Sequence, residues 1–219
     1  MEADRDPSRE ARGAGPASAG ERSALAAVYR PGRVGVADGP AAVTIRERTG
    51  RLLVQVSGWP GSFGAVCASL ENVLAMPTPR DGRTAVSKGS VTLFRVSPER
   101  VWIAAAVGLP ALVDLRSRLG RDAVVTQIDH GRVVLRVGGS GAAVALNRGL
   151  PVDLDPAVFP DGAFAQSVIH GISVLVHRVG AADPGAAFDV YVPRDYAVSF
   201  WEWLTGVAQT LGCDVEPVR

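Results

Sequence analysis

Two hydrophobic periodicities alternate along the chain from Leu25 onward. An apolar run at 52–56 is typical of a strand, and a glycine-rich turn at 57–61 ends it. The next apolar side chains recur at helical spacing and predict a helix from Phe63 to Leu74, with Ser62 as its N-cap. Proline cannot continue a helix, so the Pro-containing stretch 76–79 ends it.

The next segments complete one α+β unit. Residues 80–90 are expected to form an exposed loop, and Ser97-Pro98-Glu99-Arg100 predicts the turn of a hairpin. The predicted elements are strands at 91–96 and 101–105, a helix at 110–119 that stops at Gly120, and a strand at 123–128. Their order with the preceding elements, βαββαβ, is that of a ferredoxin-like unit.

The second half repeats this pattern. Residues 53–58 and 134–139 have similar content, and each leads into a predicted helix. The elements expected here are strands at 133–137, 164–169, 172–179 and 188–192, and helices at 142–148 and 195–211. The sequence therefore predicts an α+β fold of two tandem ferredoxin-like units, at 24–129 and 130–219.

Residues 1–23 form a segment of different character. They contain no Val, Ile, Leu, Phe, Trp or Tyr, and charges of both signs alternate with Gly, Ala, Ser and Pro. Such a segment buries too little apolar surface to offset its ordering entropy, which predicts a disordered tail. We expect that residues 1–22 can be deleted without loss of folding. It lacks the apolar core of a secretory signal. Apolar runs such as 101–107 are shorter than the ~20 residues of a membrane helix. We therefore expect a cytoplasmic protein that does not span a membrane.

Composition excludes several function classes. Lys and Arg number 23 against 22 acidic residues, and a net charge of +1 argues against a nucleic-acid binder that depends on many phosphate contacts. The only cysteines are Cys67 and Cys213, which excludes a disulfide framework and a four-cysteine zinc site.

Few residues carry candidate chemistry. His130 and His170 each precede a glycine at an expected turn, and His177 lies within a strand pattern. Roles in turns and in the core explain these histidines best, although the sequence does not exclude a general base among the three. Residues 138–141 (Gly-Gly-Ser-Gly) follow a strand and open a helix, but they match neither G-x-G-x-x-G nor G-x-S-x-G. We assign no catalytic, cofactor-binding or metal-binding residue from the sequence.

Two large apolar side chains are candidates for a partner interface. Trp203 lies at the edge of the apolar arc of the last helix, and Phe159 lies in a loop stiffened by Pro156 and Pro160. Large aromatics carry much of the energy of protein interfaces, but both side chains could equally belong to the core.

A motif in the second half carries a family resemblance. Residues 148–160 read Arg-Gly-Leu-Pro-Val-Asp-Leu-Asp-Pro-Ala-Val-Phe-Pro, followed by Gly162, Ala165-Gln166-Ser167 and Val192-Pro193-Arg194. This pattern resembles the gamma subunit of heterotetrameric sarcosine oxidase over about 132–211. The chain departs from the family at Gln127-Ile128-Asp129 and at Arg194-Asp195, both in expected turns.

The resemblance implies a fold and a role. The fold would be that of the folate-binding domain of aminomethyltransferases of the glycine-cleavage T-protein type. The role would be that of an accessory subunit, not catalytic by itself, bound to alpha, beta and delta subunits. Flavins (FAD and FMN), NAD, folate and zinc would belong to those partners. The complex oxidises sarcosine to glycine with formation of hydrogen peroxide and methylenetetrahydrofolate.

Two alternatives remain open at this point. One is a stand-alone folate-binding aminomethyltransferase-like protein, for which 219 residues are short. The other is the equivalent subunit of a complex that dehydrogenates a related N-methyl amino acid or imino acid.

Overall fold

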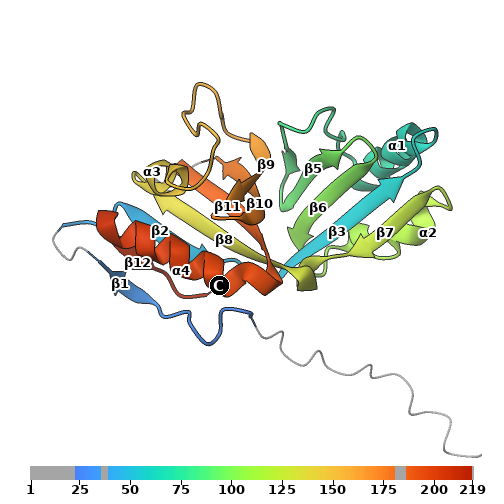
Figure 1. Cartoon of the computed structure of the whole chain (residues 1–219). Coiled ribbons are helices and arrows are strands. Elements are labelled where there is room, and N and C mark those ends of the chain that lie inside the picture. Colours follow the sequence, from blue (N-terminus) through green and yellow to red (C-terminus); the bar gives the residue numbers. More distant parts are fainter. Residues whose placement is uncertain (1–22, 36–38, 181–185, 219) are drawn as a thin grey trace, which may run out of the picture.

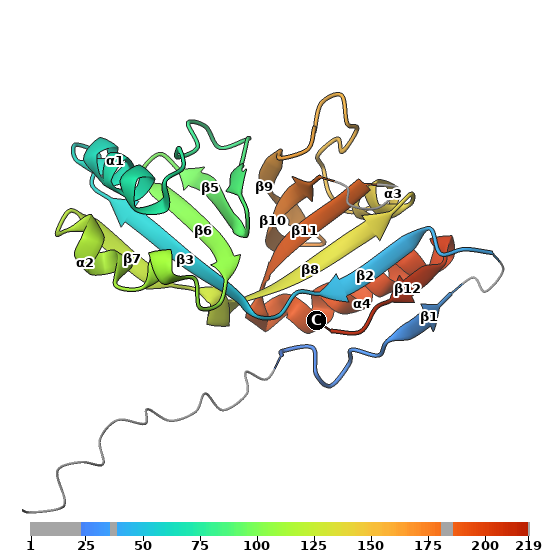
Figure 2. The same cartoon turned by 180° about the vertical axis from the view of Figure 1, so that it is seen from behind.

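The chain folds into two β-sheets with helices on their outer faces. The structure, a computed structural model, describes residues 23–35, 39–180 and 186–218. The tail predicted at 1–23 lies outside the described residues except for Ser23. The sheets converge where β3 and β8 begin and diverge away from that point, with α4 and α3 flanking one sheet and α1 and α2 the other (Figures 1 and 2).

The smaller sheet has the predicted ferredoxin-like order. Its strands lie in the order β4-β5-β6-β3-β7. The elements are β3 (Arg51–Gly58), α1 (Phe63–Leu74), β4 (Val86–Lys88), β5 (Val91–Ser97), β6 (Arg100–Ala106), α2 (Leu115–Leu119) and β7 (Ala123–Gln127). Each predicted element is present, and β4 is an additional short strand in the expected loop. The helix predicted at 110–119 is divided into a 3₁₀ turn (Pro110–Leu112) and α2, because Asp114 adopts a left-handed conformation.

The larger sheet contains strands from both ends of the described chain. Its order is β1-β12-β2-β8-β11-β10-β9, in which β12 runs parallel to β2. The elements are β1 (Gly32–Val34), β2 (Val43–Glu47), β8 (Arg132–Gly139), α3 (Ala142–Asn147), β9 (Phe164–Ile169), β10 (Ile172–Val179), β11 (Ala186–Pro193), α4 (Ala197–Ala208) and β12 (Cys213–Val215). The helix predicted at 195–211 comprises α4 and the 3₁₀ turns at its two ends.

This arrangement changes the predicted second unit. In a ferredoxin-like unit the strand after the second helix would lie beside the first strand. Here β2 occupies the place beside β8, and β12 lies one position further out. The larger sheet therefore includes β1 and β2 from the N-terminal half, so sheet membership does not follow the expected boundary between residues 129 and 130. The mixed α+β class itself is confirmed.

Successive side chains of a strand point to opposite faces of its sheet, so the outer and inner faces contribute to different apolar cores. On β8, Val133, Leu135 and Val137 face α3 and α4, whereas Val134 faces the smaller sheet. The helices thus cover one core on each sheet, and a third apolar cluster joins the inner faces. That third cluster contains Leu53, Ala85, Phe94, Trp102, Ala104, Val134, Phe164, Leu175 and Tyr191.

The Gly-rich turn at 138–141 brings two backbone segments together. Gly139 has a φ of +99°, and a Cβ placed on it would lie 2.4 Å from the carbonyl oxygen of Ala42. The Gly141 N–H donates a hydrogen bond of 2.7 Å to the same oxygen. Packing against the residue that precedes β2 therefore accounts for this turn.

We expect Gly139→Ala to lower the free energy of unfolding by about 1–3 kcal/mol, because the methyl group meets backbone and the φ is unfavourable for alanine. Urea unfolding measures the change. Gly131→Ala is the control, since a Cβ there has no atom within 4 Å. Equal stability of the two variants would contradict the close approach.

Among the described residues, no helix combines the length and apolar character needed to cross a membrane.

Candidate functional site

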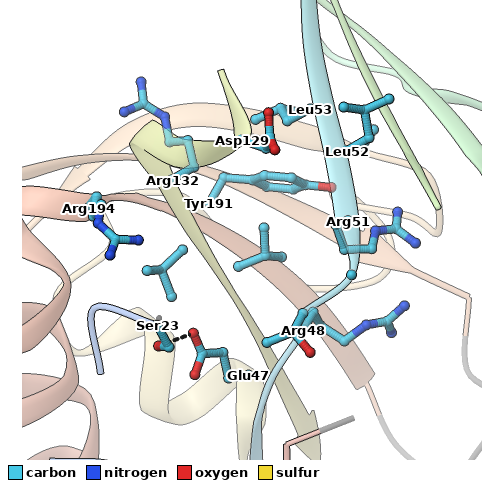
Figure 3. A pocket seen from close by; sticks show the side chains of 15 residues that line it. Ser23, Glu47, Arg48, Arg51, Leu52, Leu53, Asp129, Arg132, Tyr191 and Arg194 are labelled. Atoms are coloured by element: carbon cyan, nitrogen blue, oxygen red, sulfur yellow. Dashed lines mark hydrogen bonds between the residues drawn. The ribbon is translucent and has the colours of Figure 1, made fainter. Parts of the chain in front are cut away.

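A pocket lies where the two sheets converge. Its volume is about 260 Å³, and the connection between β2 and β3 forms much of its wall. Figure 3 shows Tyr191 between Arg194 on one side and Arg48 and Arg51 on the other. The lining residues are Ser23, Glu47, Arg48, Thr49, Gly50, Arg51, Leu52, Leu53, Ala104, Asp129, Arg132, Val133, Val134, Tyr191 and Arg194.

Four arginines line this pocket. Arg48 and Arg51 flank the β2–β3 turn, Arg132 begins β8, and Arg194 follows β11. Burial lowers the pKa of Arg48 and of Arg132, and neighbouring cations add to this effect at Arg48. Arginine stays protonated in proteins, so the pocket carries a strong positive charge. The Arg132 guanidinium carbon also lies 5.4 Å from the centre of the Trp102 ring, a cation–π contact that fixes its position.

Glu47 is the most deeply buried charged residue of the pocket, with 4% of its surface exposed. Ser23 Oγ donates a hydrogen bond of 2.5 Å to Glu47 Oε1, whereas Oε2 is buried without a hydrogen-bond partner among the described residues. The Glu47 N–H donates to Tyr29 Oη, which donates in turn to the carbonyl oxygen of Glu216. Burial, the largest cause, raises the pKa of Glu47, and the Ser23 hydrogen bond and the charge of Arg194 oppose it.

Asp129 supplies a second buried acceptor. Gln127 Nε2 donates a hydrogen bond of 3.1 Å to Asp129 Oδ2, and His130 Nε2 lies 3.9 Å from the same oxygen. Asp129 Oδ1 is buried and, within the described ranges, receives no hydrogen bond. The pocket therefore combines cationic side chains with two carboxylate oxygens that lack donors.

A buried ion pair lies on the inner face of the larger sheet, next to the pocket. Arg136 Nε and Nη2 donate hydrogen bonds of 2.5 and 2.8 Å to the two oxygens of Asp189. Across the strand pair, His177 lies directly opposite Asp189, and burial lowers its pKa to about 4. Burial also raises the pKa of Tyr191. The histidine is therefore neutral at pH 7, and this cluster is a fixed part of the sheet interface.

The three histidines do not come together. His130 is exposed, and His170 forms the β9–β10 turn with positive φ angles at His170 and Gly171. His177 packs its ring against Phe94 at a centroid distance of 5.0 Å. Within the part of the chain that the structure describes, no group of three or more His, Cys, Asp or Glu side chains is placed to hold a metal ion.

The two interface candidates differ in exposure. Phe159 is 6% exposed and belongs to the core under α3 and α4, which is the core alternative that the sequence left open for this side chain. Its N–H bonds to the Asp155 carbonyl at 2.8 Å, and this tight turn directs the ring inward. Trp203 is half-buried, lies beside Gly149 and has its ring centre 5.5 Å from that of Phe200. It remains the interface candidate of the pair.

The pocket residues were not identified from the sequence. Glu47 ends a run, Val-Thr-Ile-Arg-Glu, whose alternation of apolar and polar residues predicts a half-buried strand. A glutamate on the apolar face of that alternation is the signal that could have indicated a buried acid. Asp129 was noted only as a departure from a family motif.

Comparisons with known proteins agree with the resemblance in the sequence. The subunit gamma of sarcosine oxidase from Corynebacterium sp. (strain U-96) is 28% identical over 144 residues, which are 65% of this chain and 69% of that protein. No family model matches the chain.

Two solved structures share the fold. A chain of the heterotetrameric sarcosine oxidase from Corynebacterium sp. U-96, in complex with pyrrole 2-carboxylate, superposes with a TM-score of 0.75 at 22% identity, covering 87% of this chain and 95% of that chain. Aminomethyltransferase T of the glycine cleavage system from Bartonella henselae has a TM-score of 0.58 at 17% identity, covering 80% and 48%. The recognition made from the sequence is confirmed: this chain is similar to the gamma subunit of sarcosine oxidase and shares its fold with aminomethyltransferase T.

Proposed function

We propose that this chain is the accessory gamma-type subunit of a heterotetrameric sarcosine oxidase. The observation that carries this proposal is the structural match, which spans 87% of this chain and 95% of one chain of a heterotetrameric enzyme. A curated gamma subunit also matches by sequence. The chain would assemble with alpha, beta and delta subunits in the cytoplasm. The complex would oxidise sarcosine to glycine, with formation of hydrogen peroxide and methylenetetrahydrofolate.

In this proposal the redox cofactors are held by the partners. FAD, FMN, NAD, folate and zinc would all bind outside this chain. The pocket at the sheet junction is consistent with this assignment for the flavins, because its volume of about 260 Å³ is too small to enclose a flavin dinucleotide.

We expect the four subunits, expressed together, to purify as one complex that oxidises sarcosine and shows flavin absorbance. The lone chain should be colourless and inactive. Trp203→Ala should weaken co-purification, because loss of a large anchor at an interface typically costs ~2 kcal/mol or more. Size-exclusion chromatography and absorbance spectra measure both effects.

A control variant distinguishes a defect in assembly from a defect in folding. Val144→Ala removes apolar surface from an exposed position on α3 and should leave both assembly and melting temperature unchanged. A chain that binds flavin by itself, or that fails to join the other subunits, would contradict the proposed function. If the complex forms but prefers another N-methyl amino acid or an imino acid, kcat/KM for those substrates identifies the related dehydrogenase.

A further inference from the structure

Four arginines form a patch on the inner faces of the two sheets. Arg46 on β2 lies directly opposite Arg136 on β8. Arg48 follows on the same face as Arg46, because side chains two residues apart along a strand point the same way. Its N–H donates a hydrogen bond of 2.9 Å to a carbonyl oxygen of β8, which continues the strand pairing beyond the end of β2. Arg51 begins β3 two residues before Leu53, which packs in the cluster between the sheets. We call these four residues the arginine patch.

Two members of the arginine patch have an acidic partner within the chain. Arg46 Nη1 lies 3.1 Å from Glu216 Oε2, and Arg136 binds both oxygens of Asp189. Arg46 Nε is buried and has no acceptor among the described residues, so this guanidinium is only partly satisfied. Both neighbouring carboxylates are therefore already engaged and cannot neutralise the other two arginines.

Arg48 and Arg51 are the members without a counter-ion. Both side chains are half-buried, and no described carboxylate lies within ion-pair distance of either guanidinium. In Figure 3 the two guanidinium groups point to the same side, away from Glu47. Burial lowers the pKa of Arg48, and the charges of the other three arginines lower it further. A half-buried positive charge of this kind is stabilised by an anion supplied from outside the chain.

The spacing of the arginine patch limits what that anion can be. A guanidinium binds a carboxylate best through two parallel hydrogen bonds, so each arginine prefers a carboxylate of its own. Arg46 and Arg48 project from one strand about 7 Å apart, which is the distance between alternate residues of any extended chain. The spacing therefore favours several carboxylates carried on one extended segment over a single small anion.

We propose that the arginine patch docks an extended acidic segment of a partner protein, whose carboxylates at alternate positions face Arg46, Arg48 and Arg51. The segment is bound and not modified. The inference does not rest on the proposed assembly, since it follows from the charges and the strand register of this chain alone.

Three peptides test the inference by isothermal titration calorimetry on the full chain. The first has three glutamates separated by single serines, with both ends blocked, and it should show saturable 1:1 binding. In the second peptide glutamine replaces each glutamate, and binding should be about tenfold weaker or more, because hydrogen bonds to charged groups contribute that much. The third has the same three glutamates side by side. It should bind about threefold more weakly than the first, because successive side chains of an extended segment point to opposite sides.

Salt and inorganic phosphate distinguish the source of the anion. Binding of the alternating acidic peptide should weaken as salt rises from ~0.01 to ~0.1 M, over which the screening length falls from ~30 to ~10 Å. Inorganic phosphate at the concentration of the peptide should not displace it, because a single anion cannot replace three spaced carboxylates.

Variants assign the binding to the unpaired arginines. Arg48→Gln combined with Arg51→Gln should weaken the alternating acidic peptide about tenfold or more. Arg48→Lys combined with Arg51→Lys keeps the charge without the planar fork, and should bind more tightly than the glutamine pair. The control is Arg116→Gln on α2, which is exposed and lies outside the arginine patch. Thermal melts establish that each variant is folded.

The inference would be overturned by any of five results. These are no saturable binding of the alternating acidic peptide, equal binding of the neutral peptide, equal binding of the peptide with adjacent glutamates, unchanged binding by the glutamine pair, and displacement by equimolar phosphate. The last result would identify a site for a small anion. If the glutamine pair does not fold, the comparison of peptides on the unaltered chain still decides. The assembly experiment fails or succeeds independently of these titrations.

Discussion

Asp189→Ala is expected to lower the free energy of unfolding by about 3–5 kcal/mol. The carboxylate is 4% exposed and receives two hydrogen bonds from Arg136, whose side chain is itself only 24% exposed. Removing one member of a buried pair leaves the other charge desolvated and unpaired, which is far more costly than loss of a surface pair. Urea unfolding, followed by circular dichroism, measures the difference.

A double variant and a surface variant identify the cause. Arg136→Met combined with Asp189→Ala removes both charges and should recover a large part of the lost stability. Asp214→Ala breaks the exposed pair with Arg33 and should cost about 1 kcal/mol or less. An Asp189→Ala chain as stable as the Asp214→Ala chain would show that Asp189 is not buried in the way described.

Acidification should destabilise the fold through His177. Burial lowers its pKa to about 4, below the 6.5 of an unfolded chain, and its exposed fraction is only 4%. The unfolded state therefore binds more protons between these values, and the free energy of unfolding should fall as the pH falls from 6.5 to 4. The loss attributable to His177 is on the order of 3 kcal/mol, from 1.36 kcal/mol per pKa unit.

Comparison with His177→Gln isolates this contribution. Glutamine does not titrate, so the variant should lose stability less steeply over the same pH range. His130→Gln is the control, because that side chain is exposed and its removal should leave the slope unchanged. Parallel pH profiles for the unaltered chain and His177→Gln would contradict the assignment.

The spacing of apolar residues predicted the elements of the smaller sheet well, because its strands and helices are consecutive along the chain. The segment from Arg51 to Gln127 is contiguous, and its apolar positions divide between the core under α1 and α2 and the cluster between the two sheets. β1, β2 and β12 were not predicted. β1 and β12 have only three residues each, too few for a period to be recognised, whereas the five residues of β2 do alternate. The pairing of β12 with β2 joins residues far apart in sequence, and no local signal specifies such a contact.

The pocket was harder to predict for the same reason. Ser23, Glu47, Asp129 and Arg194 come from four separate segments, and no spacing between them forms a motif. The sequence could show that Glu47 interrupts an apolar face, but not which side chains surround it. Phe159 shows the same limit: flanking prolines indicated a stiff loop but left an interface role and a core role equally open, and only the turn closed by the Asp155 carbonyl shows that the ring is buried.

The insertion of β2 between β8 and β12 has a consequence for how the protein folds during synthesis. The smaller sheet uses one continuous stretch of chain and can form as soon as residue 127 has left the ribosome. The larger sheet cannot be completed until residue 215 has emerged, because β12 closes the contact between β1 and β2. Long-range pairing of this kind is intrinsically slow. Until then the edge of β2 is unpaired, which makes the nascent chain most prone to aggregation in the interval before β12 docks.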